Sequence, residues 1–129
     1  FYSVVYPDKE IFDLLFPKLP NIDSSYKENK TILHIAIESD SEDKGFFNII
    51  EAIVLSKIDL NAQDKYGNTP LWYACIYYVV NKRTIDLLIR NGADINIKNI
   101  YGSTIYESAK SANRTELLEM IENITSGKE

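Results

Sequence analysis

The side chains that most often do chemistry in proteins are few in this sequence, and their spacing offers no catalytic set. His34 is the only histidine, so the chain by itself cannot assemble a histidine-based metal cluster or catalytic triad. Cys75 is the only cysteine and lies in the apolar run ACIYYVV, which favours a small core residue over a nucleophile. Acidic pairs such as Asp40 and Glu42 stand in a charged stretch, where the burial that shifts a pKa is not expected. No G-x-G-x-x-G or other phosphate loop is present. We therefore predict a protein without catalytic residues, metal ligands or a cofactor.

Length and composition are those of a single globular domain. The 129 residues are enough for one hydrophobic core, but not for two independent ones. No apolar run approaches the roughly 20 residues that span a bilayer, and no signal peptide is recognisable, so we expect a cytoplasmic protein that does not bind membranes. The chain opens with the apolar segment FYSVVY rather than with Met, which suggests a segment removed upstream.

The acidic side chains are concentrated in the first half of the chain. Of the formal net charge of −5, the whole excess comes from residues 1–60, which hold eleven acids against six lysines. This balance disfavours nucleic acid, whose phosphates need a basic surface. It is compatible with a basic protein partner.

The clearest feature of the sequence is an internal repeat. Three sets of residues recur with the same two spacings, 38 and 35 residues, and the central copy between Asn61 and Asn96 is the best formed. The sets are Thr31, Thr69 and Thr104; Asp23, Asn61 and Asn96; and Asn29, Gly67 and Gly102. A shared register in three landmarks indicates a repeat architecture, in which each unit buries its apolar face against its neighbours.

Local signals in the central copy predict two helices. Thr69 is a good N-cap whose hydroxyl can accept from the first-turn N–H groups, and Pro70 suits the first helical position. The apolar stretch 84–89 predicts the second helix, and Gly92 predicts a left-handed stop. We place the two extra residues of this copy around 76–80, at the end of the first helix. We expect Val79, Val80 and part of the tyrosine pair to be buried, and either Tyr77 or Tyr78 faces outward as an anchor or both are packed.

The flanking copies carry related signals. Gly67 and Gly102 fall where a tight turn needs positive φ, and Asn29 takes the same place in the first copy. In the last copy Thr104 and Glu107 form a T-x-x-E capping box, which predicts a helix start there.

These residues resemble the ankyrin repeat family, whose unit of about 33 residues carries the signature T-P-L-H-x-A. The signature stands here as TPLWYA at 69–74, TILHIA at 31–36 and, faintly, TIYESA at 104–109, and the second half of the unit as LLIRNGADIN at 87–96. The resemblance implies an all-α solenoid of stacked helix-turn-helix units joined by β-turn or hairpin loops. It also implies that His34 ties its helix to the backbone.

The repeat register divides the chain into one domain, 1–129. We predict a partial repeat at 1–23, repeats at 24–60 and 61–95, a capping repeat at 96–124 with a polar outer face, and a tail at 125–129. The repeat at 24–60 is longer than the family unit, and its excess falls in the acid-rich stretch 38–45.

The resemblance also implies where a partner binds, because ankyrin proteins usually use a concave face made of turn tips and the exposed side of each first helix. The corresponding residues are Lys65, Tyr66, Asn68, Ile76, Tyr77, Ile100, Tyr101 and Ser103, together with Glu38 and Asp40 in the acidic stretch. Trp72 replaces the signature histidine and either fills the groove between helix and hairpin or contributes to the interface. The tyrosines either anchor a partner or only contact neighbouring turns. If they are anchors, removing Tyr66 and Tyr101 together weakens binding with little loss of stability.

Three hypotheses of function remain open on the sequence. The first is a non-enzymatic module, monomeric on its own, that binds a protein partner through the concave face. A narrower form of it is an immunity or inhibitor protein that neutralises a basic toxin or enzyme. The alternative of another class is a structural segment of a longer ankyrin array.

Overall fold

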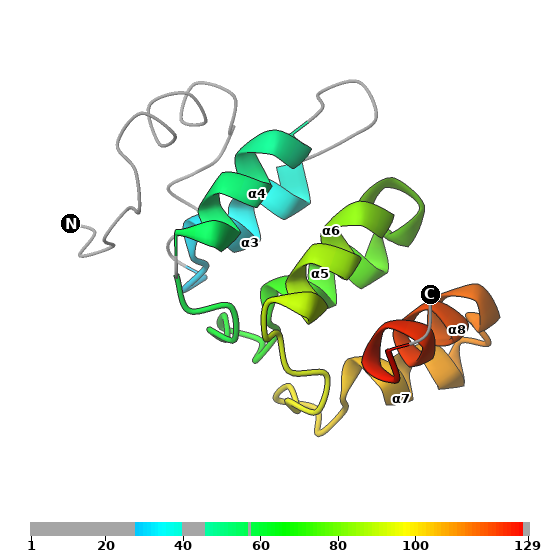
Figure 1. Ribbon diagram of the computed structural model, residues 1–129. Helices are drawn as coiled ribbons and strands as arrows, with labels where there is room; N and C mark the ends of the chain where they lie inside the picture. The colour runs from blue at the N-terminus through cyan, green and yellow to red at the C-terminus, as the bar shows by residue number, and fades with distance from the viewer. Residues whose placement is uncertain (1–27, 40–45, 57, 128–129) are drawn as a thin grey trace.

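The computed structural model describes residues 28–39, 46–56 and 58–127, and every regular element in these ranges is an α-helix (Figure 1). The helices are α3 (Ile32–Ser39), α4 (Phe47–Leu55), α5 (Pro70–Ile76), α6 (Tyr78–Arg90), α7 (Ile105–Ser111) and α8 (Thr115–Thr125). The predicted all-α class is confirmed.

The helices stack as three pairs. Contacts join α3 to α4, α5 to α6 and α7 to α8 within each pair, and successive pairs touch through α3–α5–α7 in one layer and α4–α6–α8 in the other. Figure 1 shows the turn segments before α5 and α7 along one edge of this stack, with the α5–α6 and α7–α8 connections at the opposite edge. This is the arrangement of a helical solenoid, in which each pair contacts only its neighbours.

The core is a continuous aliphatic layer between the two rows of helices. Side chains that are fully buried come from both helices of every pair, and include Leu33, Ile53, Leu71, Leu88 and Leu117. A short two-helix unit has too little apolar surface to be stable alone, so this shared layer is what holds the pairs together.

Positive φ angles mark equivalent positions of the three turns. Asn29 has φ 64°, Gly67 φ 77° and Gly102 φ 78°, as the repeat register predicts. Gly92 has φ 105° and ends α6, and the N–H of Ala93 donates to the carbonyl of Leu88 at 2.9 Å. The turn and stop predictions are confirmed.

The two predicted helix starts differ in how they are capped. Thr104 and Glu107 make the full capping box, with the Thr104 hydroxyl accepting from the Glu107 N–H at 3.1 Å and Glu107 Oε1 accepting from the Thr104 N–H at 3.1 Å. Thr69 has the extended backbone of an N-cap and is followed by Pro70, but no described first-turn N–H donates to its hydroxyl. The Trp72 N–H donates instead to the Thr69 carbonyl at 3.0 Å, so our prediction of a side-chain cap there was wrong.

The second helix of the central pair begins earlier than predicted. The prediction placed it at 84–89, whereas α6 starts at Tyr78 and contains a non-helical residue, Asn81 (φ −108°, ψ 21°). Tyr77 separates α5 from α6 with φ −103° and ψ 42°, and its carbonyl accepts from the Asn81 side chain at 3.1 Å. The extra residues therefore lengthen the start of α6, with a kink, instead of extending α5. The burial that we predicted for this run cannot be followed at residues 78–80, whose side chains lie outside those that the structure describes.

Some predictions fall on other parts of the chain that the structure does not describe. The partial repeat at 1–23 and residues 40–45 of the acidic stretch lie outside the described ranges. At the other end α8 runs through Thr125, one residue into the range that we assigned to a tail.

Candidate functional site

The turns before α5 and α7 are built by one acceptor side chain each. Asp64 Oδ1 accepts from the N–H groups of Tyr66 and Asn68, both at 2.9 Å. Asn99 does the same one repeat later, accepting from Tyr101 at 3.0 Å and from Ser103 at 3.2 Å. An acceptor that satisfies two backbone donors fixes the turn conformation, so both turns are rigid supports for the residues at their tips.

Backbone hydrogen bonds tie each turn to the next. The Lys65 N–H donates to the Glu28 carbonyl at 2.7 Å, and the Ile100 N–H donates to the Tyr66 carbonyl at 3.0 Å. The two bonds are equivalent, since Ile100 and Tyr66 occupy the repeat positions of Lys65 and Glu28. The tips therefore form one row, whose spacing is set by the stacking of the helices.

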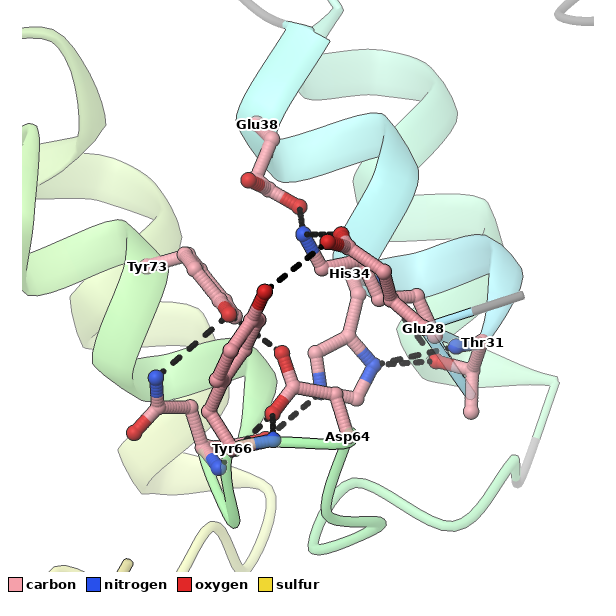
Figure 2. Close-up of polar contacts among 9 residues, drawn as sticks. Glu28, Thr31, His34, Glu38, Asp64, Tyr66 and Tyr73 are labelled. Atoms are coloured by element: carbon pink, nitrogen blue, oxygen red, sulfur yellow. Dashed lines mark hydrogen bonds and ion pairs between the residues drawn. The ribbon is translucent and has the colours of Figure 1, made fainter. Parts of the chain in front are cut away.

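His34 links the first pair of helices to the second turn. Its Nε2 lies 2.9 Å from the Asn68 carbonyl, and its Nδ1 accepts from the Thr31 N–H at 3.1 Å (Figure 2). Because a carbonyl can only accept, the proton must be on Nε2, and Nδ1 is then the acceptor of a neutral ring. The implied role of His34, tying its helix to the backbone, is confirmed.

The neutral ring of His34 makes stability depend on pH. Burial lowers the pKa of His34, against the opposing effects of the Asn68 carbonyl and nearby Asp64 and with a further lowering by Lys30. In the unfolded chain a histidine titrates near pH 6.5, so between that pH and the folded pKa the unfolded state binds more protons. We expect the free energy of unfolding to be constant above about pH 6.5 and to fall below it, by at most about 1.4 kcal/mol per pH unit.

Urea unfolding at several pH values between about 7.5 and 5 checks this, since carboxylates titrate mainly below that window. A His34→Gln variant is the control, because it has no histidine and should lose the slope. The same slope in the variant would assign the pH dependence to other groups.

Lys30 is the centre of an ion-pair cluster with Glu28 and Glu38, whose side chains are labelled in Figure 2. Its buried ammonium lies 3.0 Å from Glu28 Oε1, 2.8 Å from Glu38 Oε1 and 4.9 Å from the centre of the Tyr73 ring. Burial alone would lower the pKa of Lys30, but the two carboxylates outweigh it and raise that pKa. The Tyr66 hydroxyl joins the cluster by donating to Glu28 Oε2 at 3.0 Å.

Among the described residues, the large apolar side chains that remain exposed are Leu55 at the end of α4 and two separate pairs. Ile100 and Tyr101 are 63% and 76% exposed at the tip of the third turn. Ile76 and Tyr77 are 44% and 52% exposed, but they lie where α5 ends, at the edge of the stack opposite to the turns. The structure thus does not bring the predicted residues into one patch.

The remaining predicted residues are placed as follows. Lys65 is exposed, with its ammonium 5.7 Å from the centre of the Tyr66 ring. Asn68 and Ser103 are half-buried, and Trp72 is partly buried and packs against the core. Glu38 is held by Lys30, and Asp40 lies outside the described residues.

Sequence reasoning missed the two residues that organise the turns, Lys30 and Asp64. Asp64 could have been found, because it stands three residues before Gly67 as Asn99 stands before Gly102, and acceptor side chains at that place start turns. Lys30 left no such signal. Its partners are Glu28 and Glu38 of its own repeat and Tyr73 of α5, and only the stacking brings Tyr73 to it.

We next consider the other side chains in the described residues that could react or bind a metal ion. Cys75 is fully buried, and burial raises the pKa of its thiol to about 12, so it is protonated at neutral pH. Among the described residues no three His, Cys, Asp or Glu side chains are arranged to hold a metal ion. None of the described helices has the length and apolar character needed to cross a membrane.

Comparison with known proteins identifies the family to which this chain belongs. The model of three ankyrin repeats matches residues 1–99 and, in a second overlapping register, 41–124. An ankyrin repeat protein of Rickettsia felis is 32% identical over 126 residues, covering 94% of this chain and 54% of that protein. An ankyrin repeat protein of fowlpox virus is 43% identical over 51 residues, which are 40% of this chain and 10% of the relative. The tyrosine-protein kinase Shark of Drosophila melanogaster is 28% identical over 115 residues, which are 88% of this chain and 12% of the kinase.

This chain therefore spans about half the length of the bacterial relative and about a tenth of the other two. The family match covers nearly every residue from 1 to 124 and agrees with the paired, stacked helices of the structure. Ankyrin repeats generally mediate protein binding. The chain belongs to the ankyrin repeat family.

Proposed function

We propose that this chain is a non-enzymatic module that binds a partner protein through the tips of its second and third turns. We call this surface the turn face, and define it by Lys65, Tyr66, Asn68, Ile100, Tyr101 and Ser103. The observation that carries the proposal is the exposure of Ile100 and Tyr101 on a turn held rigid by Asn99.

The proposal is supported physically by the small loss of conformational entropy when such a surface binds a partner. The backbone of the third tip is fixed to the second by the Ile100–Tyr66 hydrogen bond, so binding need not order it. Tyrosine supplies a large contact area with few rotatable bonds and keeps a hydroxyl for a polar partner. An aliphatic and an aromatic side chain adjacent on a rigid tip are the composition expected of an interface centre.

The two tyrosines of the turn face have different roles under this proposal. Tyr66 donates to Glu28 and thereby connects two repeats, whereas Tyr101 is mostly exposed. Our expectation that both can be removed with little loss of stability therefore needs revision. We propose Tyr101, with Ile100, as the anchor, and Tyr66 as a residue that supports the turn and contacts the partner.

The charge of the partner is a weaker part of the proposal. Glu28 and Glu38 are acidic residues of the first half, but both are paired with Lys30. Attraction of a basic partner then depends mainly on the acidic stretch that includes Asp40. Raising the salt concentration should slow association if this attraction operates.

The test is to place a photo-crosslinking amino acid at position 101 and, as a control, at Lys110, which is exposed on α7. The partner captured at position 101 is then purified for measurement of its dissociation constant. We expect Ile100→Ser with Tyr101→Ala to weaken binding about tenfold or more. The urea midpoint should stay nearly unchanged, because both side chains are exposed.

A partner that crosslinks equally at both positions, or that binds the double variant as tightly as the wild type, would rule out the turn face as the interface. The narrower hypothesis of an inhibitor or immunity protein is not carried forward, since none of the relatives described above bears such a description.

A further inference from the structure

The layer of second helices carries a groove that the turn face does not use. It has a volume of about 440 Å³ and runs along α6, between α4 and α8. Its floor is apolar and is formed by Phe47 of α4, Leu87 of α6 and Met120 of α8. We call it the outer groove. It contains no residue of the turn face.

The α6 wall of the outer groove is basic. Lys82 and Arg83 line it at one end and Arg90 lines it two turns later, with Asp86 between them, and the three cations are exposed. This contrasts with the protein as a whole, which has 19 acids against 14 lysines and arginines. A cationic strip on an anionic protein marks a place where an anionic ligand is attracted locally.

Contacts within the groove hold the arginines in defined positions. The Arg83 guanidinium carbon lies 3.9 Å from the centre of the Phe47 ring, so the cation stacks on the ring. Stacking uses the flat face of a guanidinium and none of its N–H donors. These donors lie at the edge of the group and are suited to carboxylates. Arg90 Nε lies 2.7 Å from Asp86 Oδ1, which orients that side chain along the helix.

The opposite wall has the other charge. Glu51 of α4 faces the groove, so an anionic group is repelled from the α4 side and attracted to the α6 side. Across its width the groove therefore presents Glu51, an apolar floor and the α6 cations, one of which, Arg90, is paired with Asp86 on the same wall. This arrangement of charged and apolar groups is complementary to an amphipathic segment with an apolar face and an acidic edge.

We propose that the outer groove binds an acidic amphipathic helix of a partner protein, with its apolar side chains on Phe47, Leu87 and Met120 and its carboxylates on the α6 cations. From Lys82 to Asn91 the groove extends about 13 Å, which accommodates roughly two to three turns of helix. This site is independent of the turn face, and the partner has the opposite charge to the one expected there.

The test uses a fluorescein-labelled synthetic helix of about 15 residues, with Leu and Phe on one face and Glu along one edge. A matched peptide has Lys at each Glu position. We expect fluorescence polarisation to show saturable binding of the acidic peptide, weakened by salt, and no binding of the basic one.

Variants locate the site. We expect Lys82→Glu with Arg83→Glu to weaken binding of the acidic peptide about tenfold or more. Lys98→Glu with Lys110→Glu changes the net charge by the same amount at exposed positions away from the groove, and should alter binding less than about twofold. Ile100→Ser with Tyr101→Ala should also leave peptide binding intact, which separates this proposal from the proposed function.

Equal weakening by both charge-reversal pairs would mean that the peptide senses only the net charge, and would overturn the proposal, as would absence of saturable binding. Circular dichroism verifies that each variant is folded. Amide chemical shifts of the wild-type protein with the peptide give a second readout, and changes confined to α4, α6 and α8 are expected. Changes centred on the turns would contradict the outer groove.

Discussion

Replacing Gly67 with alanine is expected to lower the free energy of unfolding by about 3 kcal/mol, or to prevent folding. Two costs add at this position. Its φ of 77° lies in the left-handed region, which costs an alanine about 1–2 kcal/mol. A Cβ built there would lie 2.7 Å from the Ile100 nitrogen and 2.9 Å from the Asn99 Cα, and forced overpacking costs about 1–3 kcal/mol more. Urea unfolding, followed by circular dichroism, measures the loss.

Gly102→Ala is the matched control, because it separates the two costs. Gly102 has nearly the same φ, 78°, but a Cβ there would meet no atom within 4 Å. We expect this variant to lose only the backbone cost, about 1 kcal/mol. Equal losses at both positions would show that the close approach of the third turn to Gly67 does not constrain the protein.

Replacing Asp64 with alanine is expected to cost about 3 kcal/mol, because three donors lose one acceptor. Asp64 is buried, and its carboxylate accepts from the N–H groups of Tyr66 and Asn68 and from the Tyr73 hydroxyl. The Tyr73 hydroxyl is also buried, so without Asp64 its proton has lost its acceptor. The variant should also weaken partner binding, since the second turn loses its fixed conformation.

Asp64→Asn distinguishes loss of the acceptor from loss of the charge. Asn99 makes the two equivalent backbone contacts in the next turn with an amide oxygen, which shows that asparagine fits this geometry. We expect the asparagine variant to lose about 1–2 kcal/mol, less than alanine, because both backbone contacts remain and only the Tyr73 proton loses its acceptor. If asparagine were as damaging as alanine, the negative charge itself would be required.

These two predictions concern the same property, the rigidity of the row of tips. Gly67 allows the third turn to approach the second, and Asp64 fixes the second turn on the helices below it. Ile100 and Tyr101 are exposed on a support that these contacts hold in place. A binding surface of this kind loses function when its support loosens, even though the anchoring side chains are unchanged.

Much of the fold could be predicted from single positions. The positive φ at Asn29, Gly67 and Gly102, the stop at Gly92 and the capping box at Thr104 all depend on one or a few consecutive residues. The start of α6 was missed because the extra residues around Tyr77 can extend either neighbouring helix with similar local preference. Packing of α6 against α4 and α8, which the local sequence does not contain, decides between them.

The candidate site was predictable only in part, for the same reason. The register of the repeat placed Tyr66 and Tyr101 at equivalent turn positions, and the structure places both at the tips. Their different environments depend on Glu28, which is 38 residues from Tyr66 and reaches it across the stack. Residues 100 and 101 have no such neighbour among the described residues, and so remain exposed.

By itself the sequence determined the repeat, the turns, the starts of α5 and α7, the end of α6 and the absence of a histidine-based catalytic set. Such features follow from backbone conformation, capping and residue type, which act over a few residues. Only the tertiary structure decided which tip residues are held and which are exposed, how Lys30 joins three elements, and that α6 lines a basic groove. The physical reason is that these properties depend on contacts between different repeats, such as Tyr66 with Glu28, Lys30 with Tyr73 and Arg83 with Phe47, which form only when the helix pairs stack.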